Sequence, residues 1–132
     1  DYVVGALGWA STKNLPILFI VEDNNLSILT KKKVRRNWDM HKLAKSLNLN
    51  GFNITDSSDD IIKYKSLFFK KPTLLNINTN RLFWHSGAGK DSDKTFDRYK
   101  SEIKKMGNIG KQIDLKIKKK IDNLWKKQLE KK

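Results

Sequence analysis

The residues whose types are best suited to chemistry follow the apolar run from Ile17 to Val21. Glu22 and Asp23 supply carboxylates, and Asn24 and Asn25 place amide oxygens beside them. Oxygen-rich sets of this kind are what Mg²⁺ or Ca²⁺ prefers, and ligands collect at the carboxyl ends of strands in open α/β sheets. The sequence leaves two interpretations of this stretch open, a metal-binding turn or a polar turn that only ends a strand.

A second group of polar residues lies in the loop 80–94, after another apolar run. Parallel strands would send both loops out of the same edge of the sheet, where they could converge on one ligand. The stretch 87–90, Gly-Ala-Gly-Lys, hints at a phosphate loop, but Trp84 and Asp91 stand where that motif needs Gly and Ser or Thr. His85 taken alone is more typical of a surface or structural histidine than of a ligand contact.

The elements that must position these loops are predicted from apolar spacing and from capping residues. They are a helix over 3–13, a strand over 17–21, a polar loop over 24–37, a helix over 39–49, a strand over 52–55, a helix over 59–70 and a strand over 73–79. The unbroken apolar run 17–21 predicts a central strand covered on both faces. Asp39 is expected to cap the second helix and Gly51 to stop it. We therefore expect an α/β fold, a parallel sheet with helices on both faces.

The remainder of the chain, residues 95–132, is predicted to be a helical extension of the α/β domain 1–94. Its two helices are expected to break at 107–110, and lysines surround the apolar residues of the second helix. The apolar residues at helical spacing are Ile113, Ile117, Ile121, Leu124, Trp125 and Leu129. We interpret this face as a docking surface, with a nucleic-acid or membrane helix as the alternative.

The composition narrows the function classes. Lys and Arg number 28 against 14 Asp and Glu, but only four are arginine, so the excess favours a lysine-covered surface over specific nucleic-acid recognition. The absence of cysteine excludes disulfides and thiolate zinc sites. The apolar run near the start is far shorter than the ~20 residues that span a bilayer. We expect a soluble, cytoplasmic protein without membrane contact.

The sequence resembles a known family in two ordered segments. The stretch 15–30, LPILFIVEDNNLSILT, resembles the LPxxFxxENNxYAIST end of the thiamine-diphosphate motif in the alpha subunit of the decarboxylating component of 2-oxo acid dehydrogenase complexes. The stretches 71–75 and 79–86 resemble the family's GPTLIE and TYRYHGHS, and 91–93 with 97–99 resemble SDDPTRYR. The resemblance covers nearly the whole chain and implies the carboxyl-terminal part of a diphosphate-binding α/β domain.

The resemblance also implies a ligand set. Asn24 would bind Mg²⁺ through its side-chain oxygen and Leu26 through its backbone carbonyl, while the ion bridges the diphosphate of the cofactor. His85 would contact the diphosphate itself. The other cofactor contacts that the resemblance implies are Ile28, Arg81 and Ser86.

Several departures from the family pattern bear on activity. The family's Gly-Asp-Gly, whose Asp is the third metal ligand, is not found among the 23 residues before Asn24. Gly5 stands where the family usually has Glu, and Phe83 and Trp84 replace the His-Gly of HGHS. The resemblance thus implies an amino-terminal half carrying Gly-Asp-Gly, which either is cut from this chain or is supplied by another polypeptide. It also implies a pyrimidine-binding, beta-type subunit or domain that carries the activating Glu. No catalytic residue is expected in this chain, and the isolated chain is expected to be inactive.

The function expected from the resemblance is decarboxylation of a 2-oxo acid with transfer of the acyl or hydroxyalkyl group. Three alternatives stay open at this point. The first is a transketolase-like or carboligating thiamine-diphosphate enzyme, the second a degenerate, non-catalytic partner that keeps the fold. The third, from a different class, is a basic module that binds nucleic acid through the lysine-rich tail.

Overall fold

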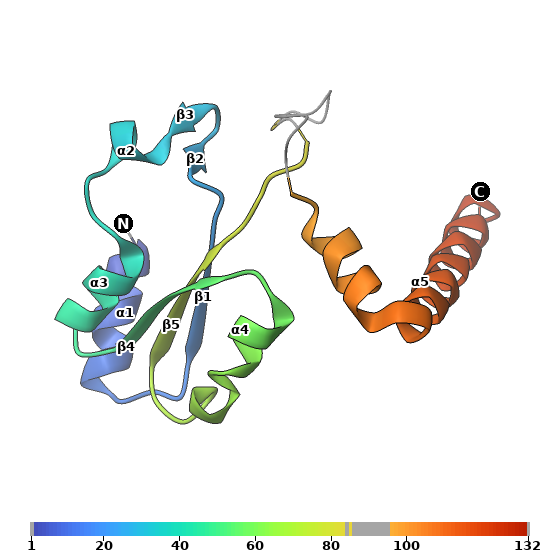
Figure 1. Ribbon diagram of the computed structural model, residues 1–132. Helices are drawn as coiled ribbons and strands as arrows, with labels where there is room; N and C mark the ends of the chain where they lie inside the picture. Colours follow the sequence, from blue (N-terminus) through green and yellow to red (C-terminus); the bar gives the residue numbers. More distant parts are fainter. Residues whose placement is uncertain (1, 84, 86–95, 132) are drawn as a thin grey trace. The chain divides into compact units, whose positions relative to one another are not determined.

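A computed structural model describes residues 2–83, 85 and 96–131 of the chain (Figure 1). The chain divides into two compact units, Asp1–Phe96 and Asp97–Lys132. The elements of the first unit are α1 (Tyr2–Thr12), β1 (Leu18–Asp23), β2 (Leu26–Ser27), β3 (Thr30–Lys31), α2 (Lys32–Arg35), α3 (Met40–Ser46), β4 (Asn50–Thr55), α4 (Ser58–Ile62), the 3-10 helix η1 (Lys65–Leu67) and β5 (Thr73–Asn78).

The first unit is built on a parallel sheet with the strand order β1-β5-β4. The predicted α/β class with a parallel sheet is therefore confirmed. The expectation that the first strand is central is wrong for this sheet, because β5 lies in the middle and is buried from Thr73 to Ile77. Among the described residues β1 pairs only with β5, and its Ile20 is 57% exposed. The apolar run of β1 therefore does not show how many neighbours the strand has, and most residues of β1 are only half-buried or exposed.

Helices cover both faces of this sheet, as predicted (Figure 1). On one face, Leu74 of β5 packs with Leu7 of α1 and Ala44 of α3. On the other face, Leu75 and Ile77 pack against the segment that contains α4 and η1. Each fully buried leucine of this kind contributes roughly 1.5–3 kcal/mol of hydrophobic free energy. Alternate residues of β5 therefore hold the two helical layers to the sheet.

The loop expected over 24–37 is more structured than its polar sequence indicates. It folds into the antiparallel hairpin β2-β3, with Ser27 opposite Thr30, and into the short helix α2. Asn25 and Ile28 adopt positive φ angles of 60° and 58°. Asn accepts this backbone region more readily than most residues, but a β-branched Ile does not. The turn at Ile28 is therefore not signalled by residue type.

Two predicted helix boundaries and one predicted capping contact are also corrected. α3 ends at Ser46, and Asn48, with φ 61°, turns the chain in place of Gly51, which lies inside β4. Asp39 occupies the N-cap position of α3, but its side chain makes no capping bond and pairs with Lys42 at 3.0 Å instead. The helix expected over 59–70 is only the short α4 followed by η1, and the Ser57 side chain caps α4 by accepting a bond from the Asp60 amide.

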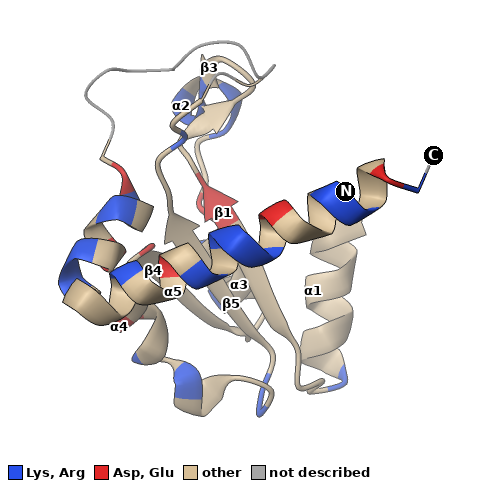
Figure 2. Cartoon of the chain, turned by 90° about the vertical axis from the view of Figure 1, so that its right-hand side faces the viewer, with Lys and Arg blue, Asp and Glu red and all other residues tan. Residues whose placement is uncertain are grey.

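The second unit consists of α5 (Arg98–Leu129), in which Lys and Arg residues recur along the helix (Figure 2). Asp97 caps it, because its carboxylate accepts a hydrogen bond from the Lys100 amide at 3.0 Å. The helix is kinked at Gly107, where φ is 60° and ψ is −133°, which confirms the predicted break. In the described ranges, no helix has the length and apolar character needed to cross a membrane.

Replacing Gly107 by alanine is expected to destabilise the kinked form of α5 by about 1–3 kcal/mol. The backbone angles at Gly107 belong to a region that is nearly closed to residues with a Cβ. The change in helix content and in thermal unfolding, followed by circular dichroism, checks this. Asn108→Ala is the matched control, because Asn108 does not have a positive φ and its substitution should leave the kink in place. If Gly107→Ala and Asn108→Ala unfold at the same temperature, the backbone conformation described for Gly107 is wrong.

Candidate functional site at the carboxyl edge of the sheet

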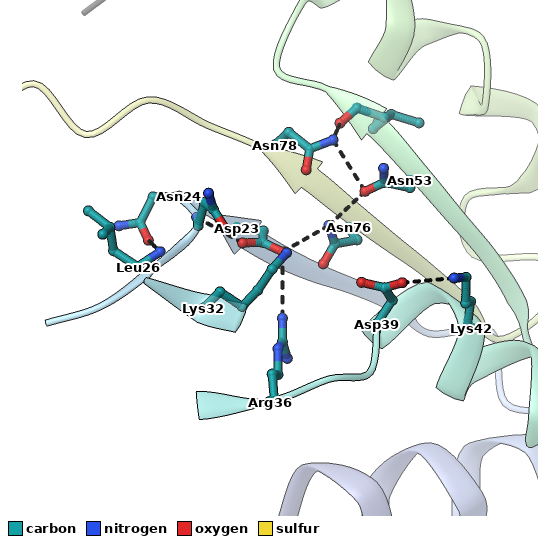
Figure 3. A network of polar contacts seen from close by, with 12 residues as sticks. Asp23, Asn24, Leu26, Lys32, Arg36, Asp39, Lys42, Asn53, Asn76 and Asn78 are labelled. Carbon is teal, nitrogen blue, oxygen red and sulfur yellow. Dashed lines mark hydrogen bonds and ion pairs between the residues drawn. The ribbon is translucent and has the colours of Figure 1, made fainter. Parts of the chain in front are cut away.

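Asp23, the last residue of β1, organises the polar contacts at the carboxyl edge of the sheet (Figure 3). It is only 8% exposed. Its carboxylate forms an ion pair with the Lys32 ammonium and lies 3.5 Å from a guanidinium nitrogen of Arg36. It also accepts hydrogen bonds from the Asn76 side-chain amide at 3.3 Å and from the Asn25 backbone N–H at 2.9 Å. Asp23 thus connects β1 with α2 and with the central strand.

These contacts keep the Asp23 carboxyl ionised. Burial alone raises its pKa, but hydrogen bonds from Lys32, Asn25 and Asn76 stabilise the carboxylate, and the pKa is lowered overall from the usual 3.8. Hydrogen bonds and a nearby cation favour the charged form of a carboxyl group. Because the charge is compensated by Lys32 and Arg36, Asp23 is an anchor for cations of the protein and is not a free ligand for a metal.

A row of asparagine amides continues from Asp23 across the sheet. The Asn76 amide donates to the Asn53 side-chain oxygen at 2.8 Å, and the Asn78 amide donates to the same oxygen at 3.2 Å and to the Ile54 carbonyl at 3.0 Å (Figure 3). The side-chain oxygen of Asn76 is buried and accepts no hydrogen bond from the described residues. We call Asp23, Asn53, Asn76 and Asn78 the polar ladder. Sequence reasoning missed it, although asparagine is depleted in strands and its recurrence there was a usable signal.

Asn24 and Leu26, the two predicted metal ligands, lie in the turn that follows β1. The side-chain oxygen of Asn24 accepts a hydrogen bond from the Leu26 backbone N–H at 3.0 Å, which orients the amide. Both residues line the same surface pocket. A carbonyl oxygen has two lone pairs, so this bond leaves one acceptor position of Asn24 for a cation.

That pocket has a volume of about 450 Å³, and its lining includes three basic and two acidic residues. Its lining residues are Val21, Glu22, Asp23, Asn24, Leu26, Ser27, Lys32, Arg35, Arg36 and Trp38. The Arg36 guanidinium lies 4.8 Å from the centre of the Trp38 ring, a cation–π contact. Sequence analysis assigned residues 32–36 to a loop and gave them no role at the site, although their run of basic residues was visible.

The loop that follows β5 meets the first loop, as parallel strands require. A guanidinium nitrogen of Arg81 donates a hydrogen bond to the Ile28 carbonyl at 2.7 Å. The predicted convergence of the two loops is therefore present at these residues. His85 is exposed in a turn and does not line the pocket. Ser86 and the glycine-lysine stretch 87–90 lie outside the described residues.

The residues of the site fit a magnesium ion in part. In the ranges that the structure describes, His, Asp and Glu residues do not gather in threes at any place able to hold a metal. Asn24 and Leu26 both line the pocket, and the uncharged donors expected there are the side-chain oxygen of Asn24 and the carbonyl of Leu26. Mg²⁺ takes six oxygen ligands and commonly draws several from phosphate and water. Asn24 and Leu26 would thus supply two of the oxygen ligands of a Mg²⁺ ion, and phosphate, water or another polypeptide would supply the others.

Fold and site together define a parallel α/β unit with a polar, basic pocket at the carboxyl edge of its sheet. Comparison of the chain with known proteins finds no relative: no family model matches the chain, and no curated protein or solved structure matches it significantly.

Proposed function

We propose that this chain anchors the diphosphate of thiamine diphosphate, with Mg²⁺, in an enzyme that acts on a 2-oxo acid. The observation that carries the proposal is the meeting of the two loops after β1 and β5. Arg81 bonds to the Ile28 carbonyl at 2.7 Å, and Asn24 and Leu26 line a pocket at the same edge. A crevice at the carboxyl ends of parallel strands is where α/β sheets bind their ligands.

The role of the chain in this proposal is to bind and orient the cofactor. Asn24 and the carbonyl of Leu26 would hold Mg²⁺, and the hydrogen bond that the Leu26 backbone N–H donates to the side-chain oxygen of Asn24 fixes the direction of the Asn24 amide. His85, Ile28, Arg81 and Ser86 stay predictions as cofactor contacts. The thiazolium ring, when bound, acts as the electron sink for decarboxylation. By holding the diphosphate, the residues of this chain would help to fix the position of that ring.

The proposal requires two further parts that this chain does not supply. One is an amino-terminal segment that carries Gly-Asp-Gly, and the other is a pyrimidine-binding subunit or domain with the activating glutamate. We therefore propose that the isolated 132-residue chain does not turn over a 2-oxo acid. Steady release of CO₂ from pyruvate by the purified chain alone would overturn this assignment of roles. Assays of the complete assembly with 2-oxo acids and with ketose phosphates distinguish a dehydrogenase from a transketolase-like enzyme.

Asn24→Ala is expected to weaken Mg²⁺-dependent binding of thiamine diphosphate to the complete assembly by about tenfold or more. Losses of 10–100-fold are typical when even the outer partners of a metal site are removed. Titration calorimetry at fixed Mg²⁺ measures the change. Asn37→Ala, which removes the same group outside the pocket, is the control and should bind as the parent does. Equal affinity of Asn24→Ala and the parent would favour a degenerate, non-catalytic partner.

A further inference from the structure

We infer that the distal limb of α5, residues 110–129, binds to the surface of an anionic lipid membrane. The inference concerns the second unit alone, so it goes beyond the proposed function and does not depend on it. Spanning a bilayer needs a long apolar segment, whereas binding in the plane of its surface needs only a helix with one apolar face and a basic remainder. The sequence left a membrane helix open as the alternative to a docking surface, and the exposure and charge of this limb favour that alternative.

An apolar stripe runs along the distal limb. Its members recur at a spacing of four residues, with one further leucine beside them, and each keeps 46% or more of its surface exposed. They are Ile113, Ile117, Ile121, Leu124, Trp125 and Leu129. At about 100° per residue, these positions lie within about 80° of Ile121, on one half of the helix. In the described part of the chain this apolar face is thus largely uncovered.

Lysines make up much of the remaining surface of the limb (Figure 2). Seven lysines occur between residues 110 and 129, against two aspartates, and all seven are exposed. Six of them lie about 80° or more from Ile121, and the seventh, Lys118, borders the apolar half, from where its long stem can reach outward. Asp114 falls within the apolar half, where its carboxylate accepts a hydrogen bond from the Tyr99 hydroxyl. The limb thus combines an apolar face with a positive charge.

The charge of the limb selects an anionic partner. A second copy is disfavoured, because pairing two apolar stripes would place their lysines side by side, and like charges repel. Nucleic acid is anionic, but it would leave Ile117 and Ile121 in water, and the limb contains no arginine, the residue best suited to paired phosphate contacts. Anionic headgroups attract lysine, and each lysine near such a surface typically strengthens binding about fivefold.

The spacing of the apolar stripe favours a flat surface over a partner helix. A seam between two helices stays in line because its apolar residues alternate spacings of three and four. A constant spacing of four turns the stripe by about 40° at each step, so it spreads over half of the helix. A bilayer surface can cover such a width. Trp125 adds to this preference, because tryptophan is enriched at membrane interfaces.

The test is co-sedimentation of the full chain with vesicles of phosphatidylcholine, with and without phosphatidylserine. We expect binding only when phosphatidylserine is present, and weaker binding as salt increases. Leu124→Gln removes one member of the stripe and should weaken binding about tenfold. Leu115→Gln is the matched control and should bind as the parent does. It makes the same change in the same limb, but Leu115 is 67% exposed and lies about 120° from Ile121.

Tryptophan fluorescence shows whether the apolar face enters the bilayer. The chain contains four tryptophans, so the emission of Trp125 is obtained as the difference between the parent and Trp125→Phe. On anionic vesicles this emission should shift to shorter wavelengths. Unchanged emission would show that the lysines only adsorb to headgroups, and it would overturn the inference.

Four sedimentation results would also overturn the inference. They are no binding to either vesicle, equal binding to both vesicles, equal weakening by Leu124→Gln and Leu115→Gln, and tighter binding of the parent to duplex DNA or polyglutamate than to anionic vesicles. The last would assign the limb to nucleic acid or to an acidic protein. Circular dichroism confirms that each variant is folded. None of these results bears on the pocket of the first unit, so the proposed function stands or fails separately.

Discussion

Gly51→Ala is expected to destabilise the first unit by about 3 kcal/mol, or to prevent its folding. Gly51 is buried in β4, directly against the backbone of α3. A Cβ at this position would overlap the His41 carbonyl oxygen and lie 3.1 Å from its carbon. Backbone atoms cannot move aside as a flexible side chain can, so α3 would have to shift away from the sheet. Forced overpacking of this kind typically costs 1–3 kcal/mol, and more where the backbone resists.

Urea unfolding of the variant measures this loss, and the chain offers its own controls. Gly5 and Gly8 lie in α1 and would have nothing within 4 Å of an added Cβ. Alanine there should stabilise the chain by about 0.5–1 kcal/mol, because glycine is a poor helix former. If Gly51→Ala unfolds at the same urea concentration as the parent, the result would contradict the close contact between the backbones of α3 and β4 at Gly51.

Asp23→Ala is expected to lower the free energy of unfolding by about 2–3 kcal/mol. The change leaves Lys32 and Arg36 without their shared carboxylate, and it removes an acceptor from the Asn76 amide. Breaking a buried ion pair costs 3–5 kcal/mol, but the two cationic side chains keep 26% and 22% of their surface exposed, so water recovers part of the loss. Asp39→Ala is the control, because the Asp39–Lys42 pair is more exposed and should contribute much less to stability.

The contribution of Asp23 should also depend on pH. The pKa of Asp23 in the folded chain lies below its usual 3.8, because the hydrogen bonds from Lys32, Asn25 and Asn76 outweigh the burial that raises it. The stabilisation is therefore complete above about pH 4 and is lost as the pH falls through the folded pKa. The stability of Asp23→Ala should fall less steeply than that of the parent below pH 4. Parallel curves for the two proteins would show that Asp23 is not stabilised in its charged form.

Much of the fold follows from local sequence patterns. The alternation of apolar runs with helical spacing predicted the parallel sheet, and glycine marked the kink at Gly107. The order of the strands in the sheet could not be predicted from the sequence. The most apolar stretch forms β1, but the central strand is β5. The polar Asn76 within β5 indicates, from sequence alone, a strand that is not fully buried. Burial of Asn76 is possible because its amide donates hydrogen bonds to Asp23 of β1 and Asn53 of β4, and these partners cannot be read from the sequence.

The site was predictable only where its residues are close in sequence. Asn24 and Leu26 were correctly placed at the carboxyl edge, because a strand followed by oxygen-bearing side chains is a local pattern. The pairing of Asp23 with Lys32 and Arg36 depends on a hairpin that folds back through a positive φ at Ile28. Since isoleucine seldom adopts that conformation, the sequence contained no signal for the turn that brings the basic residues to the pocket.

The polar ladder also has a consequence for the alignment of the strands during folding. A shift of one residue between parallel strands would turn Asn76 to the opposite face of the sheet, because side chains alternate along a strand. Its amide would then enter the layer occupied by Leu75 and Ile77, and the bonds to Asp23 and Asn53 would be lost together. An apolar residue in its place would tolerate such slippage far better. The polar ladder therefore favours the observed register of β1, β5 and β4 over a register shifted by one residue. In the observed register the carboxyl ends of the three strands lie at the same edge of the sheet.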